Sequence, residues 1–75
     1  MGKSCVMEII RAYQGELSLS HDDIRRLERN DAFLQSVVDA VNEYMEDEDI
    51  SVLSLGRYDP HTQKIIDIID KLLDY

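Results

Sequence analysis

Apolar residues recur at helical spacing in three long stretches of the chain. In each of the ranges 5–14, 32–46 and 60–73 they stand three and four positions apart, so they fall on one face of an α-helix. The apolar face of the middle stretch consists of Phe33, Leu34, Val37, Val38, Val41, Tyr44 and Met45. That of the last stretch is broader and consists of Ile65, Ile66, Ile68, Ile69, Leu72 and Leu73. Because a wide apolar arc touches more than one neighbour, we predict that the last helix is central to the core.

A fourth, shorter helix is predicted over 21–29, with Ile24 and Leu27 facing inward. Ser20 and Asp23 at its start resemble a capping box, in which Asp takes the place of the usual Glu or Gln. A residue pair of this kind satisfies two backbone N–H groups at the beginning of a helix. The pair therefore marks where this helix begins.

The chain either breaks at Asn30 and Asp31 or continues as one long helix. The second alternative depends on a heptad-like register that crosses this point. The residues in that register are Ile24, Leu27, Leu34, Val38, Val41 and Met45. Asp31 would then lie in the apolar seam of the long helix, where a carboxylate is unfavourable. We therefore predict a break, with the Asn-Asp pair ending one helix and capping the next.

Other local signals set the remaining helix ends. Ser4 can accept a hydrogen bond from a free N–H group of the first turn, and Gly15 can adopt the left-handed conformation that commonly ends a helix. Asp59 followed by Pro60 is a start signal, because Asp caps the helix and Pro at the first helical position loses no hydrogen bond.

Two short segments between the helices have no helical pattern. Residues 17–19 and 53–55 have similar sequences, and a minimal two-stranded β contact between them is an open alternative. Residues 50–55 are otherwise an apolar connector. No linker, low-complexity tract or repeat divides the chain. We therefore predict a single domain over 1–75 with an all-α fold: a compact small bundle of about four helices, the second one short.

The negative charge is concentrated in one part of the chain. The 75 residues include 8 Lys and Arg and 16 Asp and Glu, which gives a net charge of −8 at pH 7. No Lys or Arg occurs in residues 30–56, and this range contains Asp31, Asp39, Glu43, Glu46, Asp47, Glu48 and Asp49. It therefore supplies all but one of the net negative charges, and the rest of the chain is close to balanced.

This charge distribution argues against direct binding to nucleic acid or to membranes. A chain with net negative charge is repelled by phosphates and by anionic lipid surfaces. The predicted helix 32–46 has no Lys or Arg with which to contact phosphates or base edges. Arg25, Arg26 and Arg29 stand among acidic residues and are interpreted as part of a mixed, solvated face. No apolar run approaches the ~18 residues that span a bilayer.

The side chains that usually carry chemistry are few and scattered. The single cysteine, Cys5, excludes an internal disulfide and indicates an intracellular, cytoplasmic chain. We expect its thiol to be buried on the apolar face of the first helix. The other members of that face are Val6, Ile9, Ile10 and Tyr13. His21 and His61 each fall in the first turn of a predicted helix, away from metal-ligand spacing. We therefore predict no catalytic residue, no cofactor and no zinc site.

The acidic run near the middle of the chain partly matches a calcium-binding loop. Asp47, Asp49 and Ser51 occupy the first, third and fifth places of the template. Val52 stands where the template needs Gly for a sharp turn, and Tyr58 stands where it needs a bidentate Glu. Because the turn and the strongest ligand are both missing, we predict no specific metal site.

Acyl carrier proteins are likewise small, acidic and helical. Their attachment serine stands in an Asp-Ser-Leu sequence at the start of a helix. Here Ser36, between Gln35 and Val37, lies well inside a predicted helix. The similarity is one of general character, and an acyl-carrier-like or small metal-binding module is the alternative class.

We predict instead a non-enzymatic protein-interaction module that binds a basic surface on a partner protein. Small phage-encoded inhibitors, antitoxins and immunity proteins share this general character, so the expected role is that of an inhibitor or regulator. The predicted contact residues are Asp39, Glu43, Tyr44, Glu46, Asp47, Glu48, Asp49 and Tyr58. Two other interpretations stay open. The acids are only a solubilising surface, or the apolar arcs of the first and last helices pair the chain with itself as a homodimer.

Overall fold

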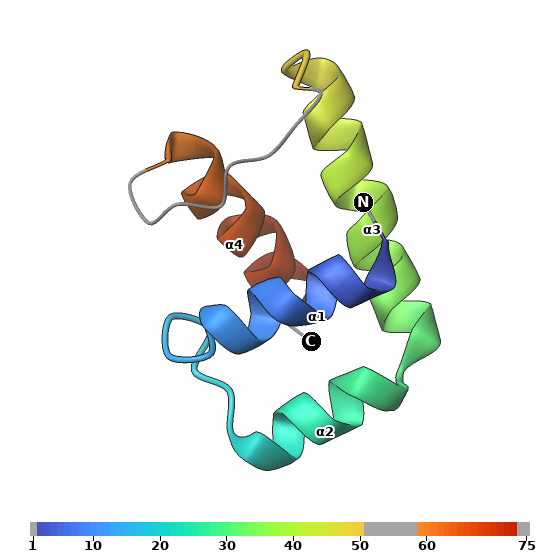
Figure 1. Ribbon diagram of the computed structural model, residues 1–75, viewed down its shortest axis with the longest axis vertical. Helices are drawn as coiled ribbons and strands as arrows, with labels where there is room; N and C mark the ends of the chain where they lie inside the picture. Colours follow the sequence, from blue (N-terminus) through green and yellow to red (C-terminus); the bar gives the residue numbers. More distant parts are fainter. Residues whose placement is uncertain (1, 51–58, 74–75) are drawn as a thin grey trace.

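The computed structural model of the chain is an all-α bundle (Figure 1). The structure describes residues 2–50 and 59–73. Over these two ranges it contains no strand and four helices: α1 (Lys3–Ala12), α2 (His21–Arg29), α3 (Asp31–Asp47) and α4 (Pro60–Leu73). The predicted fold class is confirmed, as is the short helix in second place. None of the described helices is both long enough and apolar enough to cross a membrane.

The longest helix, α3, is the centre of the bundle. It packs against α1, α2 and α4, and no other described helix contacts all of the rest. In Figure 1, α2 lies beside the start of α3, and the end of α3 projects past the other helices. The prediction that α4 holds the central place was wrong. The width of an apolar arc shows how much surface a helix can bury, but not how many neighbours will meet it.

One hydrophobic core joins the four helices. Its buried apolar members are Val6, Met7, Ile9, Ile10, Tyr13, Leu17, Ile24, Leu27, Leu34, Val37, Val38, Val41, Ile65, Ile66 and Ile69. On α4 the buried arc is narrower than the sequence predicts, since Leu72 is 39% exposed and Ile68 and Leu73 are only partly buried. The outer edge of this helix is thus left at the surface.

The thiol of Cys5 is exposed, which corrects the expectation that it is buried. Cys5 and Met7 lie at opposite edges of the apolar arc of α1, about 100° on either side of Val6. The helix can turn only one of these edges toward the core, and Met7 is the buried one. The longer methionine side chain removes more apolar surface from water than a cysteine would, which favours this rotation.

The start of α2 and the corner between α2 and α3 follow the sequence prediction. Ser20 Oγ accepts a hydrogen bond from the Asp23 N–H at 3.2 Å, and Asp23 Oδ2 accepts one from the Ser20 N–H at 3.0 Å. The capping box is therefore complete. Asn30 ends α2 with non-helical backbone angles, and its Oδ1 accepts a hydrogen bond from the Phe33 N–H at 3.1 Å. A single residue thus separates two helices, and the predicted break is confirmed.

The two ends of α1 differ from the prediction. Gly2 is the residue that precedes the first turn, and no side chain caps it, so Ser4 does not act as the cap. The helix ends at Ala12 and is followed by a turn in which Ser18, not Gly15, has the left-handed conformation, with φ 56°.

The same turn contains the first segment of the suggested β contact, residues 17–19. The Ser18 N–H donates to the Gly15 carbonyl and the Leu19 N–H to the Gln14 carbonyl, both at 3.1 Å. Those local bonds make residues 17–18 part of a turn rather than a strand. The other half of the suggested contact, residues 53–55, lies outside the described residues.

The last helix begins as predicted. Pro60 is its first residue, and Asp59 Oδ1 accepts a hydrogen bond from the His61 N–H at 2.9 Å. The side chain of Asp59 therefore satisfies one of the N–H groups that a helix leaves free at its start.

Candidate functional site

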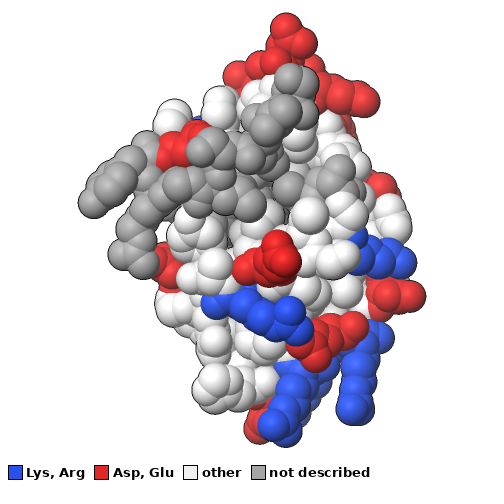
Figure 2. Space-filling view, viewed as in Figure 1, with Lys and Arg blue, Asp and Glu red and all other residues white. Residues whose placement is uncertain are grey.

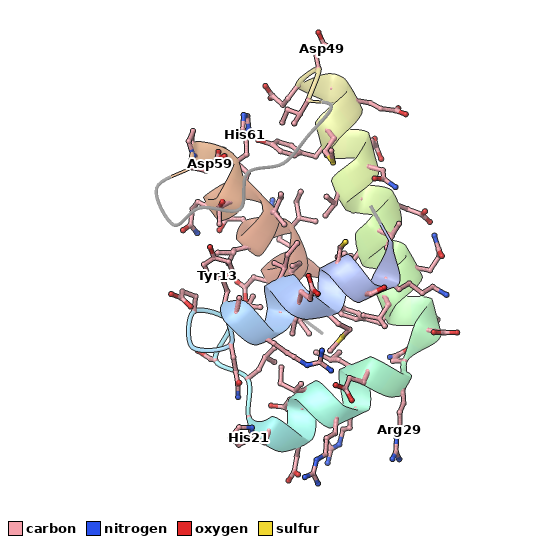
Figure 3. The ribbon with its side chains drawn as sticks, viewed as in Figure 1. Tyr13, His21, Arg29, Asp49, Asp59 and His61 are labelled. Carbon is pink, nitrogen blue, oxygen red and sulfur yellow. The ribbon has the colours of Figure 1, made fainter. Side chains whose placement is uncertain are left out.

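The end of α3 carries a group of exposed carboxylates at one extremity of the molecule. We call Glu46, Asp47, Glu48 and Asp49 the acidic end; all of them are exposed. Figure 2 shows these acidic side chains gathered at the tip of the molecule, and Figure 3 shows Asp49 extending away from the bundle. A partner could approach this tip without moving any described helix.

The acidic end is continued by a row of carboxylates along α3. Asp39, Glu43 and Asp47 stand four residues apart, so successive members are about 6 Å apart along one side of the helix. All are exposed, and Asp39 Oδ1 accepts a hydrogen bond from Gln35 Nε2 at 2.9 Å. The structure therefore joins the predicted acidic residues into one surface that runs along the second half of α3.

A defined backbone geometry ends α3 at this site. Asp49 has the left-handed conformation, with φ 54°. Its N–H donates to the Glu46 carbonyl at 3.2 Å, and the Ile50 N–H donates to the Met45 carbonyl at 2.8 Å. This pair of bonds is the Schellman arrangement, in which Gly normally holds the left-handed position. The acids thus stand on an ordered helix end that contains a strained non-glycine residue.

The acidic end also opposes the electrostatics of its helix. The carbonyl groups at a helix C-terminus carry partial negative charge, so cations are favoured there and anions are not. The last turn of α3 contains no basic residue. In the described part of the chain, none of the four carboxylates of the acidic end forms an ion pair. The acids therefore lie where they weaken the helix that carries them.

Tyr44 connects the acidic end of α3 to the start of α4. Its hydroxyl lies 2.8 Å from His61 Nδ1, and the two rings meet edge to face with centroids 5.9 Å apart. Partial burial raises the pKa of the Tyr44 phenol, and the negative charges of Glu48 and Asp59 raise it further. The phenol therefore stays neutral and can donate to the Nδ1 atom of a histidine ring whose proton is on Nε2.

The Tyr44–His61 contact could not be found from the sequence. The two residues are 17 positions apart in sequence, and neither belongs to a local motif. Tyr44 was expected to be an aromatic anchor for a partner, but it is half-buried and engaged within the bundle. Tyr58, the second expected anchor, lies outside the described residues.

The remaining candidates are the metal ligands and the carrier serine. Among the described residues, no three His, Cys, Asp or Glu side chains are placed to hold a metal ion. Ser36 lies inside α3, where its hydroxyl donates to the Ala32 carbonyl at 3.0 Å. Its place differs from the helix start that carries the attachment serine of acyl carrier proteins.

Comparison of the chain with protein-family models, with curated proteins and with solved structures found no match. The function must therefore be argued from the residues themselves.

Proposed function

We propose that this chain is a non-enzymatic interaction module whose acidic end binds a basic surface on a partner protein and so inhibits or regulates that partner. The observation that carries the proposal is the position of Glu46–Asp49 at a helix C-terminus with no basic residue in the last turn. Acids that served only solubility would need no particular position, because solubility depends on net charge and on the absence of apolar patches. Their placement at an unfavourable helix end is better explained by binding.

The arrangement of the carboxylates indicates what kind of surface they fit. A row of acids with about 6 Å between members matches Lys or Arg side chains one turn apart on a helix, or lining a groove. Complementary charge of this kind accelerates encounter and fixes orientation. The bond from Tyr44 to His61 holds α4 against the end of α3, so the acids are presented by a supported helix. Antitoxins, immunity proteins and phage-encoded inhibitors are proteins of this general type.

The test is capture of partners from a lysate of the cells in which the chain is native. One bait is wild type, and a second carries Glu46→Gln, Asp47→Asn, Glu48→Gln and Asp49→Asn. A matched control bait removes the same number of Glu and Asp charges elsewhere, through the exposed residues Glu8→Gln, Glu16→Gln, Asp22→Asn and Asp67→Asn.

We expect a partner that wild type and the control bait retain, that the acidic-end variant loses, and that is released at high salt. Equal loss from both variants would show that net charge, rather than this end of α3, attracts the partner. Equal retention by all three baits would remove the acidic end from the interface.

A further inference from the structure

A groove of about 620 Å³ lies in the half of the molecule away from the acidic end. The turn after α1, the helix α2 and the last turns of α4 form its walls. Leu17 and Leu27 are buried within it, while Leu19 and Leu73 are partly exposed along it. The groove therefore offers an apolar floor that a protruding segment could enter.

Two cationic and two acidic side chains line this groove, and two further arginines stand on α2. Arg26 reaches its edge from α2 and Lys71 from α4, and Arg25 and Arg29 are exposed on the same helix as Arg26. Within the described part of the chain none of the four forms an ion pair. Figure 2 shows basic side chains at this end of the molecule, opposite the acidic tip, and Figure 3 places Arg29 there.

Acidic side chains offset part of this positive charge, because Asp23 lies close enough to Arg26 to interact with it electrostatically. Asp23 accepts hydrogen bonds from Ser20 in the capping box, and Glu28 is paired with Arg11. Asp22 is exposed on α2, and Asp70 lines the groove from α4. Apart from the Arg11–Glu28 pair, four cations and three carboxylates thus stand on or beside the groove, which leaves an excess of one positive charge.

We propose that this groove binds the acidic end of α3 from a second copy of the chain, head to tail. The acidic end is exposed and lies at an extremity of the molecule. The partly buried Met45 and Ile50 flank it and could meet the leucines of the groove. Such a contact is heterologous, so each copy keeps one free groove or one free acidic end. Repetition of this contact builds a ring where the rotation between successive copies closes and an open filament where it does not.

Net charge sets the conditions under which this contact forms. Two chains of charge −8 repel each other, but the molecule is 34 Å long and the screening length at 0.15 M salt is only ~8 Å. At that salt the contact is attractive while the distant acids are screened. At ~0.01 M the screening length is about 30 Å and the full charges repel, and at ~1 M the contact itself is screened. Association should therefore be strongest at intermediate salt.

This inference uses the acidic end that the proposed function assigns to a partner protein, but its test needs only the purified chain. Sedimentation velocity is measured on wild type from micromolar to millimolar concentration at about 0.01, 0.15 and 1 M salt. We expect the average sedimentation coefficient to rise with concentration at the intermediate salt and much less at the other two. A chain that stays monomeric at all three would overturn the proposal.

A charge-swap experiment identifies the two surfaces. The groove variant carries Arg25→Glu, Arg26→Glu and Arg29→Glu, and the tip variant carries Glu46→Lys, Asp47→Lys and Glu48→Lys. We expect each alone to associate at least about tenfold more weakly than wild type. An equimolar mixture should regain association, because lysine tips then meet glutamate grooves and acidic tips meet arginine grooves.

A matched reversal elsewhere controls for net charge in this experiment. The variant Glu8→Lys, Glu16→Lys and Asp67→Lys has the same total charge as the tip variant and should still associate. A mixture that remains monomeric, or a control that loses association like the tip variant, would overturn the head-to-tail contact. Neither result would affect capture of a different partner by the acidic end, so the two proposals fail separately. Circular dichroism of every variant verifies that the helices are intact.

Discussion

The two ends of α3 differ in how well their residues suit a helix. At its start, Asn30 caps the helix, Asp31 adds a favourable negative charge, and Lys3 pairs with Asp31 at 3.6 Å. At its other end, a non-glycine residue takes the left-handed position and carboxylates replace the cations that would stabilise it. Local rules are usually broken where function requires it. The comparison thus separates an end whose residues stabilise the helix from an end whose residues disfavour it, which is the end that we propose binds a partner.

The largest expected effect on stability comes from neutralising the whole acidic end. The variant Glu46→Gln, Asp47→Asn, Glu48→Gln and Asp49→Asn should raise the free energy of unfolding by about 1–2 kcal/mol, because each carboxylate opposes the helix dipole. Urea denaturation at low salt measures this change. The matched control with Glu8, Glu16, Asp22 and Asp67 neutralised should show no such gain. A loss of stability in the acidic-end variant would mean that these acids stabilise the fold.

A smaller effect of opposite sign is expected at the start of α3. The change Asn30→Ala removes the cap on the Phe33 N–H and should lower the free energy of unfolding by about 1 kcal/mol. Asn30→Asp keeps an acceptor at the same place and should retain most of the stability. If Asn30→Ala is neutral in urea denaturation, the contrast between the two ends of α3 does not hold.

The backbone strain at Asp49 predicts a third change in the free energy of unfolding, equal to or smaller than the change expected for Asn30→Ala. Asp49→Gly should raise the free energy of unfolding by about 0.5–1 kcal/mol, because glycine adopts positive φ without a steric penalty. Ser18→Gly tests the same relief in the turn after α1, where no acidic cluster is present. The difference between the two gains, measured in parallel, estimates the electrostatic part at Asp49. Two losses would show that neither left-handed residue is strained.

The smallest expected effect is a pH dependence at the start of α2. Hydrogen bonds from the Ser20 N–H and then from the Ser20 hydroxyl lower the pKa of Asp23 below its ordinary value of 3.8. A carboxyl whose pKa is lower in the folded state adds stability above its unfolded pKa and loses it as pH falls through the folded pKa. The stability difference between wild type and Asp23→Asn should therefore shrink below about pH 4. Thermal unfolding at a series of pH values measures it, and a constant difference would contradict the shift.

Local signals predicted those features that depend on only a few neighbouring residues. The capping box of Ser20 and Asp23, the break at Asn30 and the start of α4 each rest on side chains that bond to nearby backbone. The position of the acidic surface along α3 followed from the charge pattern in the same way. What this surface binds remained a proposal throughout, because a charge pattern does not specify a partner.

The predictions that were wrong, and the contacts that were missed, concern features that depend on the rest of the fold. Gly15 is a good helix stop, yet the hydrogen bonds of the turn place Ser18 in the left-handed position instead. In the sequence, Cys5 and Met7 are equally good candidates for burial, because they lie at the two edges of one apolar arc and the neighbours of α1 are not known. The contact of Tyr44 with His61 and the groove beside α2 depend on how helices distant in sequence pack together. No periodicity in the sequence contains that information.

Asn30 also limits how the length of this chain can change. As the only residue between α2 and α3, it ends one helix and caps the next, so the rotation of each helix about its axis is tied to the other. Inserting or deleting one helical residue between Leu27 and Asn30 would turn the rest of α2 by about 100° relative to this corner. Ile24 and Leu27 would then leave the core, while charged neighbours would enter it. In the divergence of such a chain, this corner can accept substitutions but not insertions or deletions.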